Sequence, residues 1–149
     1  MFELKICGLS EALELSRQWA THTISLLNPE FEDNDEYTFL LPIAGKDSLL
    51  QRYYFSDDSF KAATAEKIQE ILKFTAPLQA TDKLLVHCIG GISQSTAVAC
   101  GVLCQHGFTP NDAVKYVLSI RPQALPNRHI IRLFDEILGL GGKLVAAEA

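Results

Sequence analysis

Hydrophobic and polar positions along the chain follow two different periods. Short stretches typical of strands occur in "FELKICGL", "THTISLLN", "YTFLLPIA", "LLQRYYF" and "KLLVHC". The last of these stretches is almost wholly apolar, which is typical of a central strand that is buried on both faces. The pattern therefore predicts a sheet with "KLLVHC" in its interior.

Stretches with the helical period stand between and after these strands. Ser10 is the predicted N-cap of the first helix, and a second helix is expected between Phe60 and Phe74. Three further helices are predicted in "STAVACGVLCQHG", "PNDAVKYVLSI" and "RHIIRLFDEIL". Strands that alternate with helices predict an α/β fold: a three-layer sandwich with a central, mainly parallel sheet of four to five strands flanked by helices.

Composition narrows the class of protein. A length of 149 residues suits a single domain, residues 1–149, with its own core. The net charge of −5 argues against nucleic acid and acidic membranes as partners. We see no apolar run of the ~18 residues that span a bilayer and no signal peptide. The four cysteines lack the spacing of small secreted proteins, so we expect a reduced, cytoplasmic protein.

The stretch "HCIGGISQS" carries the candidate chemistry. It joins the buried strand to the next helix, where ligands bind in open α/β sheets. Its backbone N–H groups can curl around one anion, and the helix adds its positive end. The same field would stabilise a thiolate, so Cys88 is expected to be nucleophilic at neutral pH. We expect inorganic phosphate or sulfate to be bound by the main chain of Ile89, Gly90, Gly91, Ile92, Ser93 and Gln94.

This loop resembles the signature of the Cys-dependent protein tyrosine phosphatases, H-C-x-x-G-x-x-R-[S/T]. His87, Cys88, Gly91 and Ser95 match it, whereas Gln94 stands where that family has its arginine. The stretch "RPQALPN" resembles the Arg-Pro…Pro-Asn segment of dual-specificity phosphatases. From "GISQSTAV" onward the chain is similar to compact bacterial proteins of the tyrosine phosphatase family.

The resemblance implies a two-step reaction that needs no metal and no cofactor. The Cys88 thiolate would attack phosphorus to form a phosphocysteine, and an aspartic acid would protonate the leaving group. In compact family members that aspartate lies roughly 30 residues before the cysteine, where this chain has Asp57 and Asp58; Asp57 is our first choice. Ser95 would assist departure of the sulfur, and His87 would orient the loop. The implied partner is a phosphorylated protein or a small phosphomonoester.

Several of these residues also have a purely structural interpretation. A pair of aspartates before a helix can simply cap it. Cys100 and Cys104 lie one helical turn apart in an apolar stretch, and we interpret them as core rather than as a metal or redox pair. Arg121 and Arg128 are candidates for a cation that compensates for the missing arginine, although Arg128 also suits an exposed helix face.

Glutamine in place of arginine leaves three functions open. A unit charge ~4 Å from phosphate is worth on the order of 4 kcal/mol at an effective dielectric of 20, and losing one preorganised donor typically costs ~10²–10³ in rate. The chain could be a phosphatase with weakened turnover, a pseudophosphatase that binds phosphorylated partners or small phosphates, or a rhodanese-like sulfur transferase that uses Cys88. The preceding histidine and the "RPQALPN" stretch favour the phosphatase interpretation over sulfur transfer.

Overall fold

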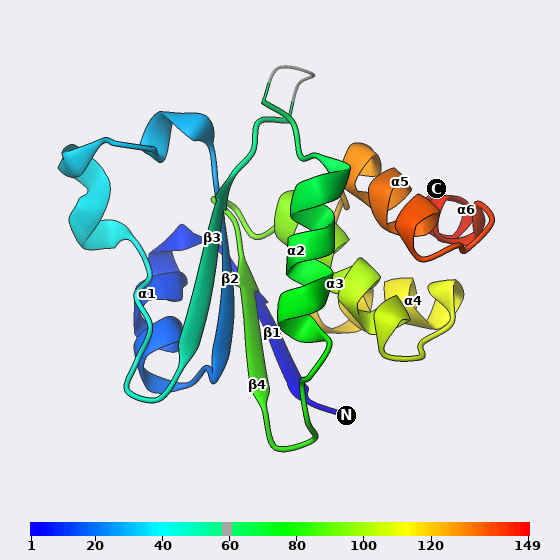
Figure 1. Ribbon diagram of the computed structural model, residues 1–149, viewed down its shortest axis with the longest axis horizontal. Coiled ribbons are helices and arrows are strands. Elements are labelled where there is room, and N and C mark those ends of the chain that lie inside the picture. Colours follow the sequence, from blue (N-terminus) through cyan, green and yellow to red (C-terminus); the bar gives the residue numbers. More distant parts are fainter. Residues whose placement is uncertain (58–60) are drawn as a thin grey trace. The chain divides into compact units, whose positions relative to one another are not determined.

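The computed structural model describes residues 1–57 and 61–149 (Figure 1). These residues form two compact units. The sheet unit consists of Met1–Ala62 and Leu78–Gly91, and the helical unit consists of Ala63–Pro77 and Ile92–Ala149. Each unit has its own buried residues and is described separately below.

The sheet unit is built on four parallel strands, which confirms the predicted α/β class and its parallel sheet. Their order is β1-β4-β2-β3, and Figure 1 shows them side by side. Leu84, Leu85 and Val86 of β4 are fully buried, as the apolar sequence of an interior strand predicts. The strands are β1 (Glu3–Cys7), β2 (His22–Leu27), β3 (Leu49–Tyr54) and β4 (Lys83–His87).

Helix α1 (Leu9–Gln18) covers one face of this sheet. Buried residues of the strands and the helix form one cluster there, made of Cys7, Ala12, Ala20 and Leu85 with Leu15 and Trp19 against it. The N-cap of α1 is Gly8, and the prediction that Ser10 caps it is wrong. The chain turns into the helix directly after β1, and therefore Ser10 already lies on the exposed first turn.

The strand predicted in "YTFLLPIA" is also wrong. Residues Asp35–Leu40 form the 3-10 helix η2, which follows a shorter 3-10 helix η1 (Pro29–Phe31). The side chain of Asn34 accepts a hydrogen bond from the Glu36 N–H at 3.1 Å and thereby starts the turn. Most apolar residues of this stretch are exposed, Phe39 by 73%, whereas Leu41 is buried.

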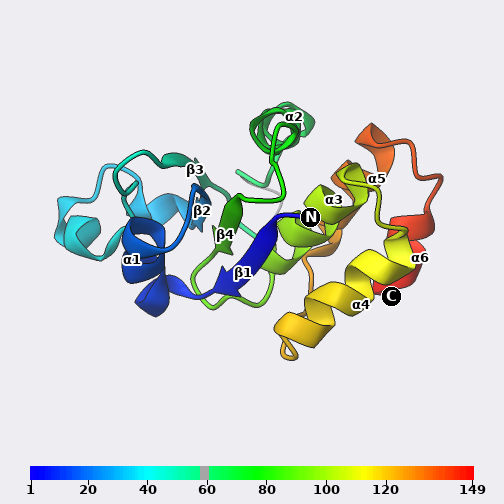
Figure 2. The ribbon, with the colours of Figure 1, turned by 90° about the horizontal axis from the view of Figure 1, so that it is seen from below.

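Five helices make up the helical unit. They are α2 (Ala65–Thr75), α3 (Gln94–Gln105), α4 (Pro110–Ile120), α5 (Arg128–Ile137) and α6 (Lys143–Glu148). Helices α4 and α5 pack on α3, and α6 packs on both of them (Figure 2). A Cβ on Gly101 of α3 would lie 2.2 Å from the ring of Phe134 on α5, so only glycine allows this close approach. The sequence pattern did not predict α6.

Helix α3 is buried over most of its length, since every residue from Gln94 to Leu103 is buried. Its far end is fixed to the end of α2 by polar contacts. The hydroxyl of Thr75 donates to the side-chain oxygen of Gln105 at 2.9 Å, and the ring of His106 lies 2.8 Å from the Thr75 carbonyl. Within residues 1–57 and 61–149, no helix has both the length and the apolar character that crossing a bilayer requires.

Candidate active site

Cys88 directly follows the central strand β4 and is only 6% exposed. Residues 88–93 connect β4 to α3, so the predicted position of the loop between a buried strand and a helix start is confirmed. The first half of the loop, residues 88–91, belongs to the sheet unit, and the second half belongs to the helical unit.

The first half of the loop lies against the start of α1. The Leu9 N–H donates a hydrogen bond to the Ile89 carbonyl at 2.9 Å. A Cβ on Gly8 would lie 2.9 Å from the same carbonyl oxygen and 3.3 Å from the carbonyl carbon of Gly90, so there is no room for a side chain. Gly91 has a φ of 67°, a left-handed conformation that favours glycine. The sequence predicted the glycine turn but not the contribution of Gly8.

His87 connects the loop to the sheet. Its Nδ1 lies 3.2 Å from the Cys88 carbonyl oxygen, and its Nε2 lies 2.6 Å from Oγ of Ser25. Burial lowers the pKa of His87 from 6.5 to about 4; the hydrogen bond to the Cys88 carbonyl opposes this, and the positive charge of Arg52 adds to it. The imidazole is therefore neutral at pH 7. The sequence did not point to Ser25 or Arg52.

The second half of the loop is held by the "RPQALPN" segment. The Leu125 N–H donates to the Ile92 carbonyl at 2.9 Å, and the Asn127 N–H donates to the Ser93 carbonyl at 3.0 Å. The side chain of Asn127 also caps α5, because its oxygen accepts from the Ile130 N–H at 2.9 Å. One asparagine thus joins the start of α5 to the loop.

Gln94 and Ser95 are the first two residues of α3. Both are buried, and Gln94 is only 4% exposed. The residue at the position of the signature arginine is therefore an interior residue of the first helical turn. That Gln94 and the main chain of residues 89–93 contact a bound phosphate stays a prediction, as does the role of Ser95.

The candidate acids follow β3. Asp57 is exposed. Its neighbour Ser56 donates its N–H to the Lys61 carbonyl at 3.0 Å. Asp58 lies outside the described residues. The choice of Asp57 as the general acid stays a prediction.

Comparison with known proteins gives different results for sequence and for structure. No protein-family model matches the chain, and no curated protein matches it. Solved structures do match. Human DUSP28 is 21% identical over 93% of this chain and 94% of its own, with a TM-score of 0.68. The human tyrosine phosphatase-like serine/threonine/tyrosine-interacting protein is 20% identical, over 93% and 92%, with a TM-score of 0.69. PTPMT1 is 18% identical, over 95% of both chains, with a TM-score of 0.64.

The chain has the fold of the dual-specificity and tyrosine phosphatases. This confirms the phosphatase-like fold that the loop signature implied. Each of these three matches extends over more than nine tenths of both chains, so the phosphatase fold also accounts for the N-terminal half.

Two arginines were predicted as substitutes for the signature arginine of the phosphatase fold. Arg121 is the half-buried C-cap residue of α4. Arg128 is the first residue of α5, its side chain is 74% exposed, and its Nε lies 3.8 Å from a carboxylate oxygen of Glu148. The charge of Arg128 is thus paired within the helical unit. That either arginine compensates for Gln94 stays a prediction.

Cys100 and Cys104 lie on α3, in the helical unit of the phosphatase fold. Burial raises the pKa of Cys100 to about 12 and that of Cys104 to about 11, so both thiols stay protonated at neutral pH. Cys100 is completely buried, which confirms that it is a core residue. In the part of the chain that the structure describes, no three His, Cys, Asp or Glu side chains are placed to hold a metal ion.

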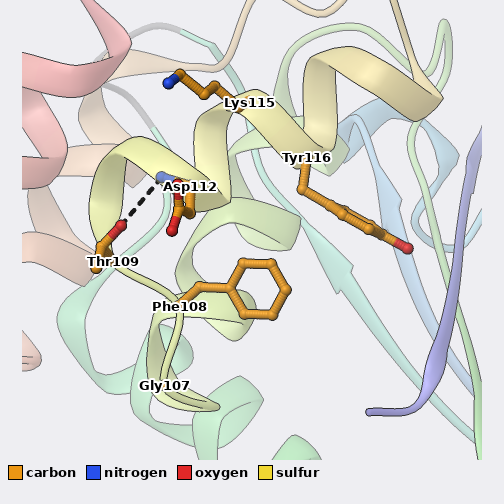
Figure 3. A pocket seen from close by; sticks show the side chains of 6 residues that line it. All are labelled: Gly107, Phe108, Thr109, Asp112, Lys115 and Tyr116. Carbon is orange, nitrogen blue, oxygen red and sulfur yellow. Dashed lines mark hydrogen bonds between the residues drawn. The ribbon is translucent and has the colours of Figure 1, made fainter.

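A hollow of about 540 Å³ lies at the start of α4 (Figure 3). Phe108 and Tyr116 form part of its wall, with ring centroids 5.7 Å apart. The Thr109 hydroxyl accepts the Asp112 N–H at 3.2 Å, so this polar group already caps the helix. None of the loop residues 88–95 lines this hollow.

Proposed function

We propose that this chain binds phosphomonoesters in the loop 88–95 and hydrolyses them slowly through a phosphocysteine intermediate. The observation that carries the proposal is the position of Cys88 on the phosphatase fold, between the buried strand β4 and the start of α3. The neutral, buried His87 directly precedes it. The substrate would be a phosphorylated protein or a small phosphomonoester.

The reaction would proceed in two displacements at phosphorus. In the first, the Cys88 sulfur forms a bond to phosphorus while the bond to the ester oxygen breaks, and Asp57 gives its proton to the leaving oxygen. In the second, Asp57 takes a proton from water, whose oxygen bonds to phosphorus. Cys88 then leaves as a thiolate, assisted by a hydrogen bond from Ser95, and inorganic phosphate is released.

Binding and turnover depend on different groups in this proposal. Main-chain N–H groups of the loop and the N-terminal end of α3 would hold the anion, and they do not depend on the side chain at position 94. An arginine would add a full charge and a planar pair of donors, whereas Gln94 contributes neutral hydrogen bonds. We therefore infer that the replacement lowers the rate more than it lowers the affinity for an oxyanion.

A second candidate function is binding without turnover. It is favoured by the burial of a neutral amide in the first turn of α3. One of the solved neighbours is itself named a tyrosine phosphatase-like interacting protein. In this candidate function the loop recognises a phosphorylated partner. Cys88 then helps to shape the loop and does not act as a nucleophile.

Hydrolysis of p-nitrophenyl phosphate and binding of vanadate separate these functions. We expect slow hydrolysis by the natural chain that disappears in Cys88→Ser, and we expect Gln94→Arg to raise kcat by roughly 10²–10³, the value of one preorganised donor. Vanadate affinity should change much less. Gln69→Arg, on an exposed position of α2, is the matched control and should leave kcat unchanged.

Three results would contradict these expectations. Hydrolysis that persists in Cys88→Ser would remove Cys88 from the mechanism. Vanadate binding without Cys88-dependent hydrolysis would favour the binding function. The absence of both would exclude the two functions together.

A further inference from the structure

Four residues form one row across the whole sheet, immediately before Cys88. Cys7 on β1 is in register with His87 on β4, His87 with Ser25 on β2, and Ser25 with Arg52 on β3. Register partners in a sheet project from the same face. The row therefore places the Arg52 guanidinium at one end. His87, the residue before the candidate nucleophile, lies next to the other end.

Hydrogen-bond chemistry fixes the direction of the bonds along this row. A guanidinium can only donate, so Arg52 Nε donates to Oγ of Ser25, at 3.4 Å. Another nitrogen of the same guanidinium donates to the Pro42 carbonyl, which holds it in place. A serine hydroxyl has one proton and two lone pairs. Accepting from Arg52 polarises the Ser25 hydroxyl and makes it a stronger donor to Nε2 of His87, at 2.6 Å.

The other ring nitrogen of His87, Nδ1, leads to the same assignment independently. A carbonyl oxygen can only accept, so Nδ1 of His87 must carry the proton that is shared with the Cys88 carbonyl at 3.2 Å. A neutral imidazole has one donor and one acceptor. Nδ1 as the donor requires Nε2 as the acceptor, which agrees with the direction that Arg52 favours through Ser25.

We propose that Arg52 is a positioning residue that acts through Ser25: it polarises the Ser25 hydroxyl and thereby favours the Nδ1-protonated tautomer of His87, which holds the Cys88 carbonyl toward the sheet. Each hydrogen bond from Arg52 to the Cys88 carbonyl is then donated in the same direction, and hydrogen bonds in such a chain polarise one another. A carbonyl held in this way points to His87 rather than to an anion bound in the loop. The consequence for Cys88 rests on the proposed function, whereas the tautomer does not.

The ring nitrogens of His87 test the proposal directly. In ¹⁵N-labelled protein at pH 7, we expect a protonated, pyrrole-type Nδ1 and an unprotonated, pyridine-type Nε2. Arg52→Met and Ser25→Ala should each replace this state by a mixture of tautomers, and Arg52→Lys should restore it because a cationic donor is retained. Arg17→Met, on an exposed position of α1 in the same unit, is the matched control.

The rate at which iodoacetamide alkylates Cys88 provides a second measurement. The Cys88 peptide is followed by mass spectrometry, so reaction at the other three cysteines does not interfere. Arg52→Met and Ser25→Ala should slow this reaction by roughly two- to tenfold, the effect of one ordinary hydrogen bond, and Arg17→Met should not. If Arg52→Met does not fold, Ser25→Ala and Arg52→Lys decide the question.

The proposal is overturned if His87 keeps a single Nδ1-protonated tautomer in Arg52→Met or, where that variant does not fold, in Ser25→Ala. Neither measurement uses a phosphate substrate, so the two proposals fail separately. Absence of phosphatase activity with the expected tautomer changes contradicts the proposed function alone. Cys88-dependent hydrolysis with an unchanged tautomer in the variants contradicts the role of Arg52 alone.

Discussion

Gln94 shows how one buried side chain can separate recognition from chemistry. It occupies the first helical turn after the loop and is almost completely shielded from solvent. An amide in this position keeps hydrogen-bonding capacity but carries no charge. Because charge develops in the transition state, the missing charge should affect the rate more strongly than the binding of a ground-state anion.

Asp57 leads to a prediction that depends on the leaving group. A good leaving group such as p-nitrophenolate departs without a proton, whereas a simple alkyl or phenyl ester needs a general acid. We expect Asp57→Asn to lower kcat for phenyl phosphate by about 10²-fold and to have a smaller effect on p-nitrophenyl phosphate. Asp33→Asn, on the exposed stretch before η2, serves as the control. An equal loss on both esters would argue against an acid role for Asp57.

His87 should make the stability of the folded chain depend on pH. Its pKa is lowered from 6.5 to about 4 in the fold, so its contribution is complete above pH 6.5 and is lost as the pH falls toward 4. The loss is on the order of 3 kcal/mol, because the unfolded chain takes up the proton first. Denaturant unfolding across this range measures it.

Two variants separate this effect from the titration of other groups. His87→Asn can still donate to the Cys88 carbonyl but has no ring to protonate, so its free energy of unfolding should fall less between pH 6.5 and 4. His129→Asn, at an exposed position of α5, should follow the natural chain. Identical slopes in all three proteins would rule out His87 as the source.

Among the secondary-structure elements, α6 depends most clearly on one distant side chain. The buried carboxylate of Asp135, on α5, accepts hydrogen bonds from the N–H groups of Gly142, Leu144 and Val145 at 2.7, 2.8 and 3.1 Å. Isolated helices of this length are not stable in water. Asp135 therefore links α6, with only six residues, to α5.

Removal of this carboxylate should weaken the helical unit. We expect Asp135→Ala to lower the free energy of unfolding by about 2–3 kcal/mol, since it leaves one buried and two part-buried N–H groups without their acceptor. The neighbouring Glu136 is exposed, and Glu136→Ala should cost less than ~0.5 kcal/mol. Urea denaturation of the two variants gives the comparison. A loss of similar size in both would mean that the carboxylate does not hold α6.

Most elements could be predicted from the sequence because their patterns are local. The apolar run of β4 and the helix "PNDAVKYVLSI", which is α4, were predicted for this reason. The strand predicted at residues 37–44 was wrong, because the local cap formed by Asn34 outweighed the strand preference of these residues. Helix α6 was missed because what stabilises it, the carboxylate of Asp135, lies outside its own segment.

The candidate site also has a part that could be predicted from the sequence and a part that could not. Cys88 and its glycine turn form a continuous motif, which the sequence makes visible. Ser25 is 62 residues from His87 and 27 residues from Arg52 along the chain, and only the parallel register of the strands brings the three together. No local pattern in β2 or β3 marks these positions, so the contacts beneath the loop required the structure.

At the scale of the whole molecule, net charge and the titration of His87 act in the same pH range. The chain carries a charge of −5 at pH 7 and has an isoelectric point near 5.3. Near that value electrostatic repulsion between molecules is smallest, and part of the contribution of His87 has been lost. We expect light scattering from a concentrated solution to be highest near pH 5.3. A maximum far from that pH would contradict this expectation.

Backbone groups, rather than side chains, supply three of the bonds that hold the cysteine loop. Leu9 in the sheet unit and Leu125 and Asn127 in the helical unit each contribute an amide N–H that every amino acid except proline also has. Most side chains at these three positions can therefore change during evolution while the hydrogen bonds to the loop are kept. Main-chain hydrogen bonds of this kind are hardly visible in a sequence comparison. This helps to explain how the same fold is retained when only about one residue in five is identical.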